Sequence, residues 1–191
     1  MSDGPSGVRG ERWVGTTAAC TPCGSALGAT WSTDTVAAVA AVLAEEAATK
    51  SVDVLLAPTV NLHRHPFAGR NFECFSEDPL LTAELAVAHI TSLQAHGTAA
   101  CIKHFVANES EFERMTISSE VSEAALRELY LVPFEYAVRA GVAAVMTAYN
   151  RLNGTPCSQN EWLITALLKG EWGFDGVVMS DWWGTYDPAA A

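Results

Sequence analysis

The chain has 191 residues, of which 22 are acidic and 11 are basic, so its formal net charge is −11 at pH 7. Apolar residues make up 49% and charged residues 17%, a globular composition without the signature of a disordered chain. A surface this acidic repels nucleic acid and anionic membranes, and no apolar run approaches the roughly 18 residues that cross a bilayer. We therefore expect a small neutral or cationic partner, with neither nucleic acid nor a membrane; cellular location stays open.

Apolar periodicity predicts a strict alternation of helices and strands from residue 33 onward. Residues 1–32 are rich in Gly, Thr and Ser and are expected to form loop with room for one short strand; Trp13 and Trp31 are expected to pack in the core or at its rim. The predicted helices cover residues 33–49, 78–97, 122–141 and about 160–172. The predicted strands cover residues 52–58, 98–105, 142–149 and 176–181.

Two local signals refine this pattern. Pro133 lies inside the third predicted helix and is expected to kink or divide it, and Asn153-Gly154 is expected to form a turn. Alternation of helices with strands that are apolar on both faces is typical of a parallel α/β sheet. The sequence therefore predicts an α/β fold.

Cysteine and histidine spacing indicates no metal or redox centre. Cys20 and Cys23 form a lone C-x-x-C, whereas a structural zinc site needs a second pair or nearby histidines, and a redox pair opens a helix after a strand. We interpret these two cysteines as ordinary small residues packed in a loop or short strand. His63 and His65 have no third ligand at a usable spacing, so we expect neither a metal nor a cofactor.

Polar side chains appear where each predicted strand ends. They are Asn61 and Arg70 after the first strand, Lys103 and His104 at the end of the second, Tyr149 and Asn150 at the end of the third, and Asp181 at the end of the fourth. In parallel α/β folds the functional face lies at the carboxyl ends of the strands. A carboxylate, cationic donors, a phenol and the indole of Trp182 suit the hydroxyls and the apolar face of a neutral sugar. No Gly-rich phosphate-binding motif is present.

Five spaced motifs carry a specific resemblance. They are DGPSGVRG at residues 3–10, GRNFE at 69–73 with SEDP at 76–79, KHF at 103–105 with NE at 108–109, MTAYN at 146–150, and MSDW at 179–182. Together they cover nearly the whole chain, and in this order they resemble the N-terminal barrel domain of glycoside hydrolase family 3, of the β-glucosidase type. The resemblance implies an incomplete (β/α)8 TIM-type barrel with parallel strands.

The resemblance also implies roles for nine residues. Asp181 would be the nucleophile in a retaining hydrolysis of the terminal non-reducing sugar of a β-glycoside or oligosaccharide. Cationic neighbours would favour the ionised state that such a nucleophile needs. The residues expected to hydrogen-bond the sugar are Asp3, Arg70, Lys103, His104, Arg114 and Tyr149. Met146 and Trp182 would shape the wall of the subsite, Trp182 by stacking on the sugar ring.

The residues that follow the KHF motif indicate which branch of the family the chain resembles. The KHF motif is followed by Val106-Ala107-Asn108-Glu109, not by the Pro-Gly-His-Gly stretch of the branch that cleaves N-acetylglucosaminides. The chain therefore resembles the glucosidase and xylosidase branch, in which the general acid is a Glu on a separate sandwich domain after the barrel. Which of glucose, xylose, arabinose or galactose is bound stays open.

The length predicts a partial domain. A complete barrel takes about 250 residues, and the chain ends ten residues after Asp181. We expect residues 1–191 to be a partial barrel domain without its first strand or strands, its final helix and the C-terminal sandwich domain. Such a chain would carry the nucleophile but no general acid, would be weakly active or inactive alone, and could self-associate through exposed barrel edges.

Simpler structural interpretations of the same residues stay open. Asp181 could only cap a following helix, as Asp often does where a strand leads into a helix. Lys103 and His104 could be a solvated pair at a strand end. Arg70 could be a structural salt-bridge partner of a nearby glutamate, Glu73 or Glu77.

Two alternative functions also remain. A lysine at a strand end can form a Schiff base, which would make the protein an aldolase-like lyase built on Lys103. The other alternative is a non-catalytic sugar-binding remnant.

Overall fold

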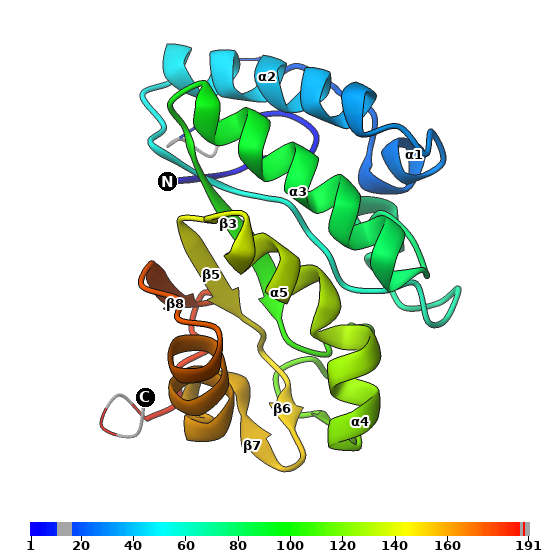
Figure 1. The fold of residues 1–191 in the computed structure, drawn as a ribbon, viewed down its shortest axis with the longest axis vertical. Helices are drawn as coiled ribbons and strands as arrows, with labels where there is room; N and C mark the ends of the chain where they lie inside the picture. The colour runs from blue at the N-terminus through cyan, green and yellow to red at the C-terminus, as the bar shows by residue number, and fades with distance from the viewer. Residues whose placement is uncertain (11–16, 188, 190–191) are drawn as a thin grey trace.

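The computed structural model describes residues 1–10, 17–187 and 189, so the prediction for Trp13 lies outside the described residues. Its centre is a five-stranded sheet in the order β1-β2-β3-β5-β8 (Figure 1). All four neighbouring pairs are parallel. The strands are β1 (Ser2–Asp3), β2 (Val54–Leu56), β3 (Ala99–Phe105), β5 (Ala144–Thr147) and β8 (Val177–Ser180). The predicted parallel α/β sheet is confirmed.

Helices connect the strands and pack beside one another along the sheet. The long helices α2 (Thr33–Thr49) and α3 (Pro79–Ala95) lie next to each other, and α5 (Val132–Arg139) follows on the far side of α3 (Figure 1). The other helical segments are α1 (Gly24–Gly28), η1 (Asn71–Glu73), α4 (Glu123–Ala125), η2 (Leu126–Tyr130), η3 (Cys157–Gln159) and η4 (Trp162–Glu171). Both η2 and η4 have π-helical geometry.

Local sequence signals explain where the helices begin. The side chain of Ser32 accepts a hydrogen bond from the backbone N–H of Thr35 and caps α2. Asp78 caps α3 in the same way through Leu81, and Pro79 occupies the first turn, where its missing N–H costs nothing. The third predicted helix is divided just before Pro133, between η2 and α5, as expected.

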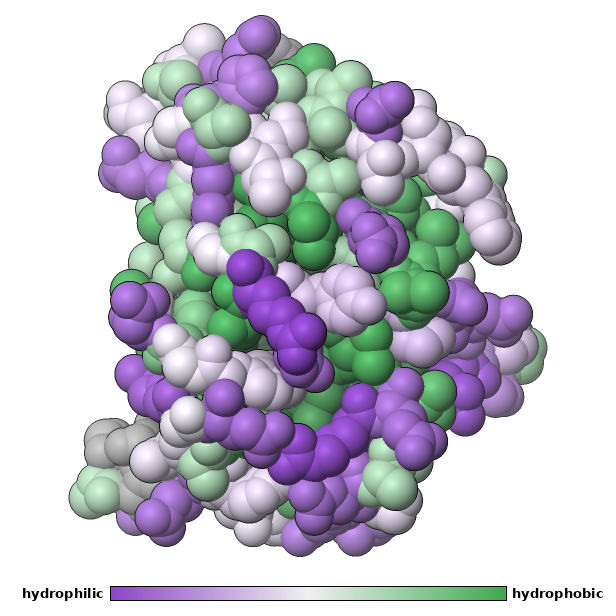
Figure 2. Space-filling view, in the orientation of Figure 1, coloured by the Kyte–Doolittle hydropathy of each residue, from purple (hydrophilic) through white to green (hydrophobic). Residues whose placement is uncertain are grey.

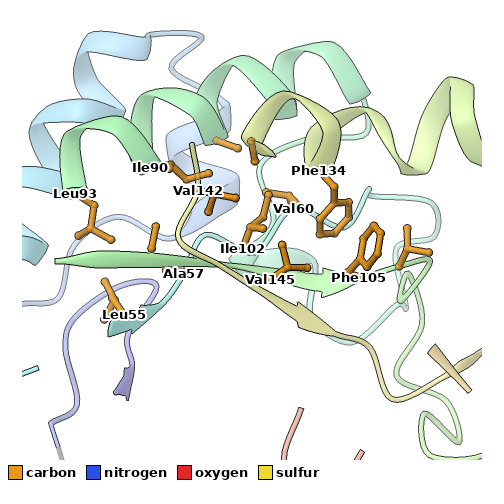
Figure 3. Close-up of a cluster of buried hydrophobic side chains, with 14 of the residues drawn as sticks. Leu55, Ala57, Val60, Ile90, Leu93, Ile102, Phe105, Phe134, Val142 and Val145 are labelled. Atoms are coloured by element: carbon orange, nitrogen blue, oxygen red, sulfur yellow. The ribbon is translucent and has the colours of Figure 1, made fainter. Parts of the chain in front are cut away.

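The main apolar core lies between the helices and one face of the sheet. Figure 3 shows Phe134 on α5 directed toward Phe105 of β3, with Ile102 and Val145 of the sheet alongside. The Phe105 and Phe134 rings meet edge to face, with 5.0 Å between their centroids. In the space-filling view, apolar residues are visible near the middle of the molecule, with hydrophilic residues dominating the lower part (Figure 2).

A second, smaller apolar cluster is formed by alternate strand residues. Its buried members are Leu56, Cys101, Ala144 and Met146. Because successive strand side chains point to opposite faces of a sheet, these residues belong to the face turned away from the main core. In a closed barrel that face would line the interior.

Two features of the structure differ from the sequence prediction. A small sheet of β4 (Ser118–Ser119), β6 (Arg151–Leu152) and β7 (Thr155–Pro156) was not predicted, although the turn at Asn153-Gly154 between β6 and β7 was. Trp31 is 77% exposed, so its predicted packing is wrong. Across the described ranges, no helix combines the length and apolar character needed to cross a bilayer.

Replacement of Phe134 by alanine tests the main core. Phe134→Ala removes a buried ring and leaves a cavity beside Phe105, so the free energy of unfolding should fall by about 3–5 kcal/mol. Phe67→Ala is the control, because the Phe67 side chain is 89% exposed and its loss should change stability by less than about 0.5 kcal/mol. Urea unfolding of both variants measures the difference; equal losses would contradict this packing.

Candidate active site

The carboxyl ends of the parallel strands place five of the predicted site residues on one rim. Asp3 ends β1, Lys103 and His104 lie near the end of β3, Tyr149 follows β5, and Asp181 follows β8 directly. The backbone N–H of Asp181 still donates to the carbonyl of Thr147, so the carboxylate is held at the last rung of the β5–β8 pair.

Asp181 is held in place but remains reachable. Its Oδ1 accepts a 2.8 Å hydrogen bond from the backbone N–H of Trp182, and its Oδ2 lies 3.6 Å from Nε2 of His104. The side chain is 15% exposed. From residue 181 to 187 the chain forms turns and irregular structure, and Gly184 N donates to the carbonyl of Asp181. Among the described residues, Asp181 therefore caps no helix.

Arg70 links the loop after β2 to the strand ends. Its Nε donates to Oε1 of Glu73 at 2.6 Å, and its Nη1 lies 3.2 Å from Nε2 of His104 and 3.6 Å from Oε1 of Glu111. Burial works against the charge, but the hydrogen bond and charge of Glu73, together with the charges of Glu111 and Asp181, raise the pKa of Arg70 above its usual value. Arg70 is thus both a salt-bridge partner of Glu73 and a neighbour of Asp181.

Lys103 connects the site to the N-terminal strand. Its Nζ lies 3.6 Å from Oδ1 of Asp3, whose Oδ2 accepts a 2.8 Å hydrogen bond from Arg9. Lys103 and His104 are both buried, so they are not a solvated pair. The contact with Asp3 holds the Lys103 side chain at the rim.

His104 is the most enclosed group of the site. Burial is the main cause that lowers the pKa of His104 well below its usual value, and the positive charges of Arg70, Lys103 and Arg114 lower it further. The imidazole is therefore neutral at neutral pH and can offer one nitrogen as a hydrogen-bond acceptor.

Arg114 and Tyr149 close another side of the site. The Arg114 guanidinium lies over the Tyr149 ring, 4.7 Å from its centroid, and donates to Oε2 of Glu111. Burial, followed by the negative charge of the nearby Asp181, raises the pKa of Tyr149 to about 12. The phenol therefore keeps its proton at neutral pH.

The two predicted wall residues differ in exposure. Trp182 is 44% exposed next to Asp181, where its ring is accessible. Met146 is 1% exposed and belongs to the inner apolar cluster with Leu56, Cys101 and Ala144. The structure thus places Met146 beneath the rim and not at its surface.

Glu111 is a site residue that the sequence analysis missed. Its carboxylate bonds Arg114, lies near Arg70 and accepts a 3.1 Å hydrogen bond from the Asn108 side chain, while its backbone N–H donates to Ala68. Glu111 therefore fixes two arginines at once and joins two loops. The three-residue spacing between Glu111 and Arg114 was the one available signal.

The two histidines considered above as metal ligands, His63 and His65, both make hydrogen bonds to the backbone. Nε2 of His63 is hydrogen-bonded to the backbone carbonyls of Asn71 and Cys74, and Nδ1 of His65 accepts from the N–H of Phe67. No group of three or more metal-binding side chains occurs among the residues with described positions.

The cysteines are free thiols in the structure. Cys74, Cys101 and Cys157 are buried. Cys23 is half-buried and directly precedes α1, whereas Cys20 is exposed, so the predicted packing is wrong for Cys20.

Comparison with known proteins assigns the family. Residues 6–188 match the family described as "Glycosyl hydrolase family 3 N terminal domain". The chain therefore belongs to glycoside hydrolase family 3.

Individual relatives agree with this assignment. A protein named β-glucosidase from Rhizobium radiobacter is 57% identical over 99% of the chain, and a probable β-glucosidase I from Aspergillus clavatus is 51% identical over 100%. The structure of β-glucosidase 3B from Thermotoga neapolitana in complex with glucose superposes with a TM-score of 0.92 at 47% identity over 98% of the chain. A β-glucosidase from Kluyveromyces marxianus, also with glucose, gives 0.96 at 44% over 99%. The chain spans only 24%, 23%, 27% and 23% of these four proteins.

The pH dependence of stability tests the electrostatics behind the site. Burial raises the pKa of Glu109 from 4.5 to about 7, although hydrogen bonds from the Leu62 N–H and Asn61 oppose the shift. As pH rises from about 5 to about 8, Glu109 loses its proton at a lower pH in the unfolded chain than in the folded chain. The free energy of unfolding therefore falls by up to about 3 kcal/mol over this range. Glu109→Gln removes this cost, and its stability relative to the unchanged chain should rise over that pH range.

The control for this measurement is Glu77→Gln, because Glu77 is exposed. Chemical denaturation at both pH values should show a constant difference between this control and the unchanged chain. A constant difference for Glu109→Gln as well would contradict the raised pKa of Glu109.

Proposed function

We propose that this site binds the terminal non-reducing sugar of a β-glycoside and that Asp181 is the nucleophile of a retaining hydrolysis. One observation carries the proposal: a partly exposed carboxylate stands at the strand-end rim beside an arginine, a neutral imidazole and a protonated phenol. Such donors and acceptors match the hydroxyls of a sugar, and Trp182 offers its ring an apolar face. Relatives named β-glucosidase and solved relatives in complex with glucose support this substrate class.

The two oxygens of Asp181 have different tasks in this proposal. Oδ1 is oriented by the N–H of Trp182. Oδ2 forms a bond to the anomeric carbon while the bond from that carbon to the leaving oxygen breaks, and the leaving oxygen takes a proton from an acid. Water then attacks the same carbon and gives its proton to the conjugate base of that acid. The bond from the carbon to Asp181 breaks, and the sugar leaves with its original anomeric configuration.

The proton donor is proposed to lie outside the glutamates that surround the site. A retaining enzyme needs a second carboxyl group about 5 Å from the nucleophile. Glu73 is bonded to Arg70 and accepts from the Thr59 hydroxyl, and Glu111 is engaged by two arginines. Glu109 accepts from the Leu62 N–H and lies 3.5 Å from Nδ2 of Asn61. We therefore propose that none of the three protonates the leaving oxygen.

We further propose that residues 1–191 form part of a larger barrel. Within the described strands, β1 and β8 each pair with one neighbour only, and Val177 at the start of β8 is exposed. An open edge of this kind is completed by further strands in a closed barrel. The same edges would support self-association of two chains.

Leaving-group dependence tests the division between nucleophile and acid. The 191-residue chain should cleave a dinitrophenyl β-glucoside, whose leaving group needs no proton, roughly 10²–10⁴ times faster than a nitrophenyl β-glucoside. Asp181→Asn should lower the faster rate by roughly 10³-fold or more. Asp175→Asn is the matched control, because it makes the same change at an exposed aspartate just before β8, and it should keep the rate.

Two results would overturn the proposal. Equal and high rates on both glucosides would mean that a group in the chain supplies the proton. Reductive trapping of a carbonyl substrate on Lys103 by borohydride, with no effect of Asp181→Asn, would favour the lyase alternative.

A further inference from the structure

Asn61 places its side-chain amide against His104 in a single orientation. The Asn61 Nδ2 donates to the backbone carbonyl of His104 at 3.1 Å, and its Oδ1 accepts from the backbone N–H of His104 at 3.0 Å. A backbone N–H can only donate and a carbonyl can only accept, so these two bonds determine which end of the amide is oxygen. Asn61 is buried, which protects this pairing from water.

The orientation of the amide decides where the imidazole carries its proton. Oδ1 of Asn61 also lies 3.3 Å from Nδ1 of His104, and an amide oxygen requires a proton on the nitrogen that it contacts. On the opposite side of the ring, Nη1 of Arg70 lies 3.2 Å from Nε2. A guanidinium has donors only, so Nε2 must accept. Two independent neighbours therefore require the same tautomer.

The surrounding charges keep the ring neutral. The cations Arg70, Lys103 and Arg114 and the burial of the ring all disfavour imidazolium. The carboxylate of Asp181 is the opposing group, but its Oδ2 is 3.6 Å from Nε2, longer than a hydrogen bond.

We propose that Asn61 is a positioning residue that holds His104 neutral and protonated at Nδ1, so that the bare Nε2 binds Arg70 and gives no hydrogen bond to Asp181. Glu109 supports the amide, because its Oε1 accepts from the Leu62 N–H at 3.1 Å and lies 3.5 Å from Nδ2 of Asn61. The contacts thus run from the buried amide of Asn61 through His104 to the guanidinium of Arg70, which lies near Asp181.

The consequence for chemistry rests on the proposed function. A proton on Nε2 would donate to Oδ2 of Asp181 and draw electron density from the attacking oxygen. The same proton would face the N–H groups of Arg70 and displace the guanidinium. Asn61 thus keeps Oδ2 of Asp181 free of a hydrogen bond from His104 and keeps Arg70 in place, although its own hydrogen bonds described above are to neither residue.

Nitrogen NMR of the ¹⁵N-labelled 191-residue chain tests the tautomer without any sugar. The His104 ring signals, assigned through correlations to its backbone, should show a protonated Nδ1 and an unprotonated Nε2 at neutral pH. A protonated Nε2, or imidazolium at neutral pH, would overturn the proposal. If the tautomer is as expected but no glycoside reacts, the proposed function alone fails.

Asn61→Asp tests whether Asn61 sets this state. An ionised carboxylate beside Nδ1 should raise the pH at which His104 takes its second proton by at least about one pH unit. At a pH where His104 is imidazolium in Asn61→Asp but neutral in the unchanged chain, the substitution should also slow cleavage of the dinitrophenyl glucoside by roughly tenfold or more, because Nε2 then donates to Asp181. Asn71→Asp is the matched control: it adds a carboxylate next to Arg70, at a residue whose amide in the unchanged chain donates to the carbonyl of His65 and not to His104.

The titration of His104 should be the same in Asn71→Asp as in the unchanged chain. An unchanged titration in Asn61→Asp would overturn the role of Asn61. If Asn61→Asp does not fold, Asn61→Ala replaces it: loss of the acceptor at Nδ1 should give a detectable Nε2-protonated fraction, and its absence would contradict the proposal.

Discussion

A half-buried guanidinium holds this site together. Arg70 bonds Glu73 within its own loop and reaches across to the imidazole of His104 on β3. A charge removed from water is tolerated only when its hydrogen bonds are satisfied, and loss of one partner leaves the other charge uncompensated. The loop after β2 is therefore tied to the sheet by electrostatics as much as by packing, and the position of Asp181 among cations depends on that tie.

The fold could be predicted where the determinants are local. The predicted helix over 33–49 has the bounds observed for α2, because Ser32 caps it and its apolar stripe is regular. Strands were predicted too long: residues 52–58 were expected and β2 covers Val54–Leu56, because apolar residues also continue into the loop at a strand's end. The sheet of β4, β6 and β7 escaped prediction because its strands have two residues each and pair across distant parts of the chain.

The sequence could predict which residues form the site but not which of them bond to one another. Strand-end position and family resemblance identified Arg70, Lys103, His104 and Asp181, and the structure brings them together. Sequence reasoning named Asn61 as a strand-end residue but could not show its bonds to His104, since these depend on how the segment after β2 packs against β3. Glu111 was missed for the same reason.

The most direct test of the account is covalent trapping of the 191-residue chain with dinitrophenyl 2-deoxy-2-fluoro-β-glucoside, followed by mass mapping of the labelled peptide. The fluorine slows both steps and the good leaving group removes the need for an acid, so the glycosyl-enzyme accumulates. The account predicts one sugar per chain, attached to Asp181. Attachment to another carboxylate such as Glu111, or no attachment to a chain that unfolds cooperatively, would contradict it.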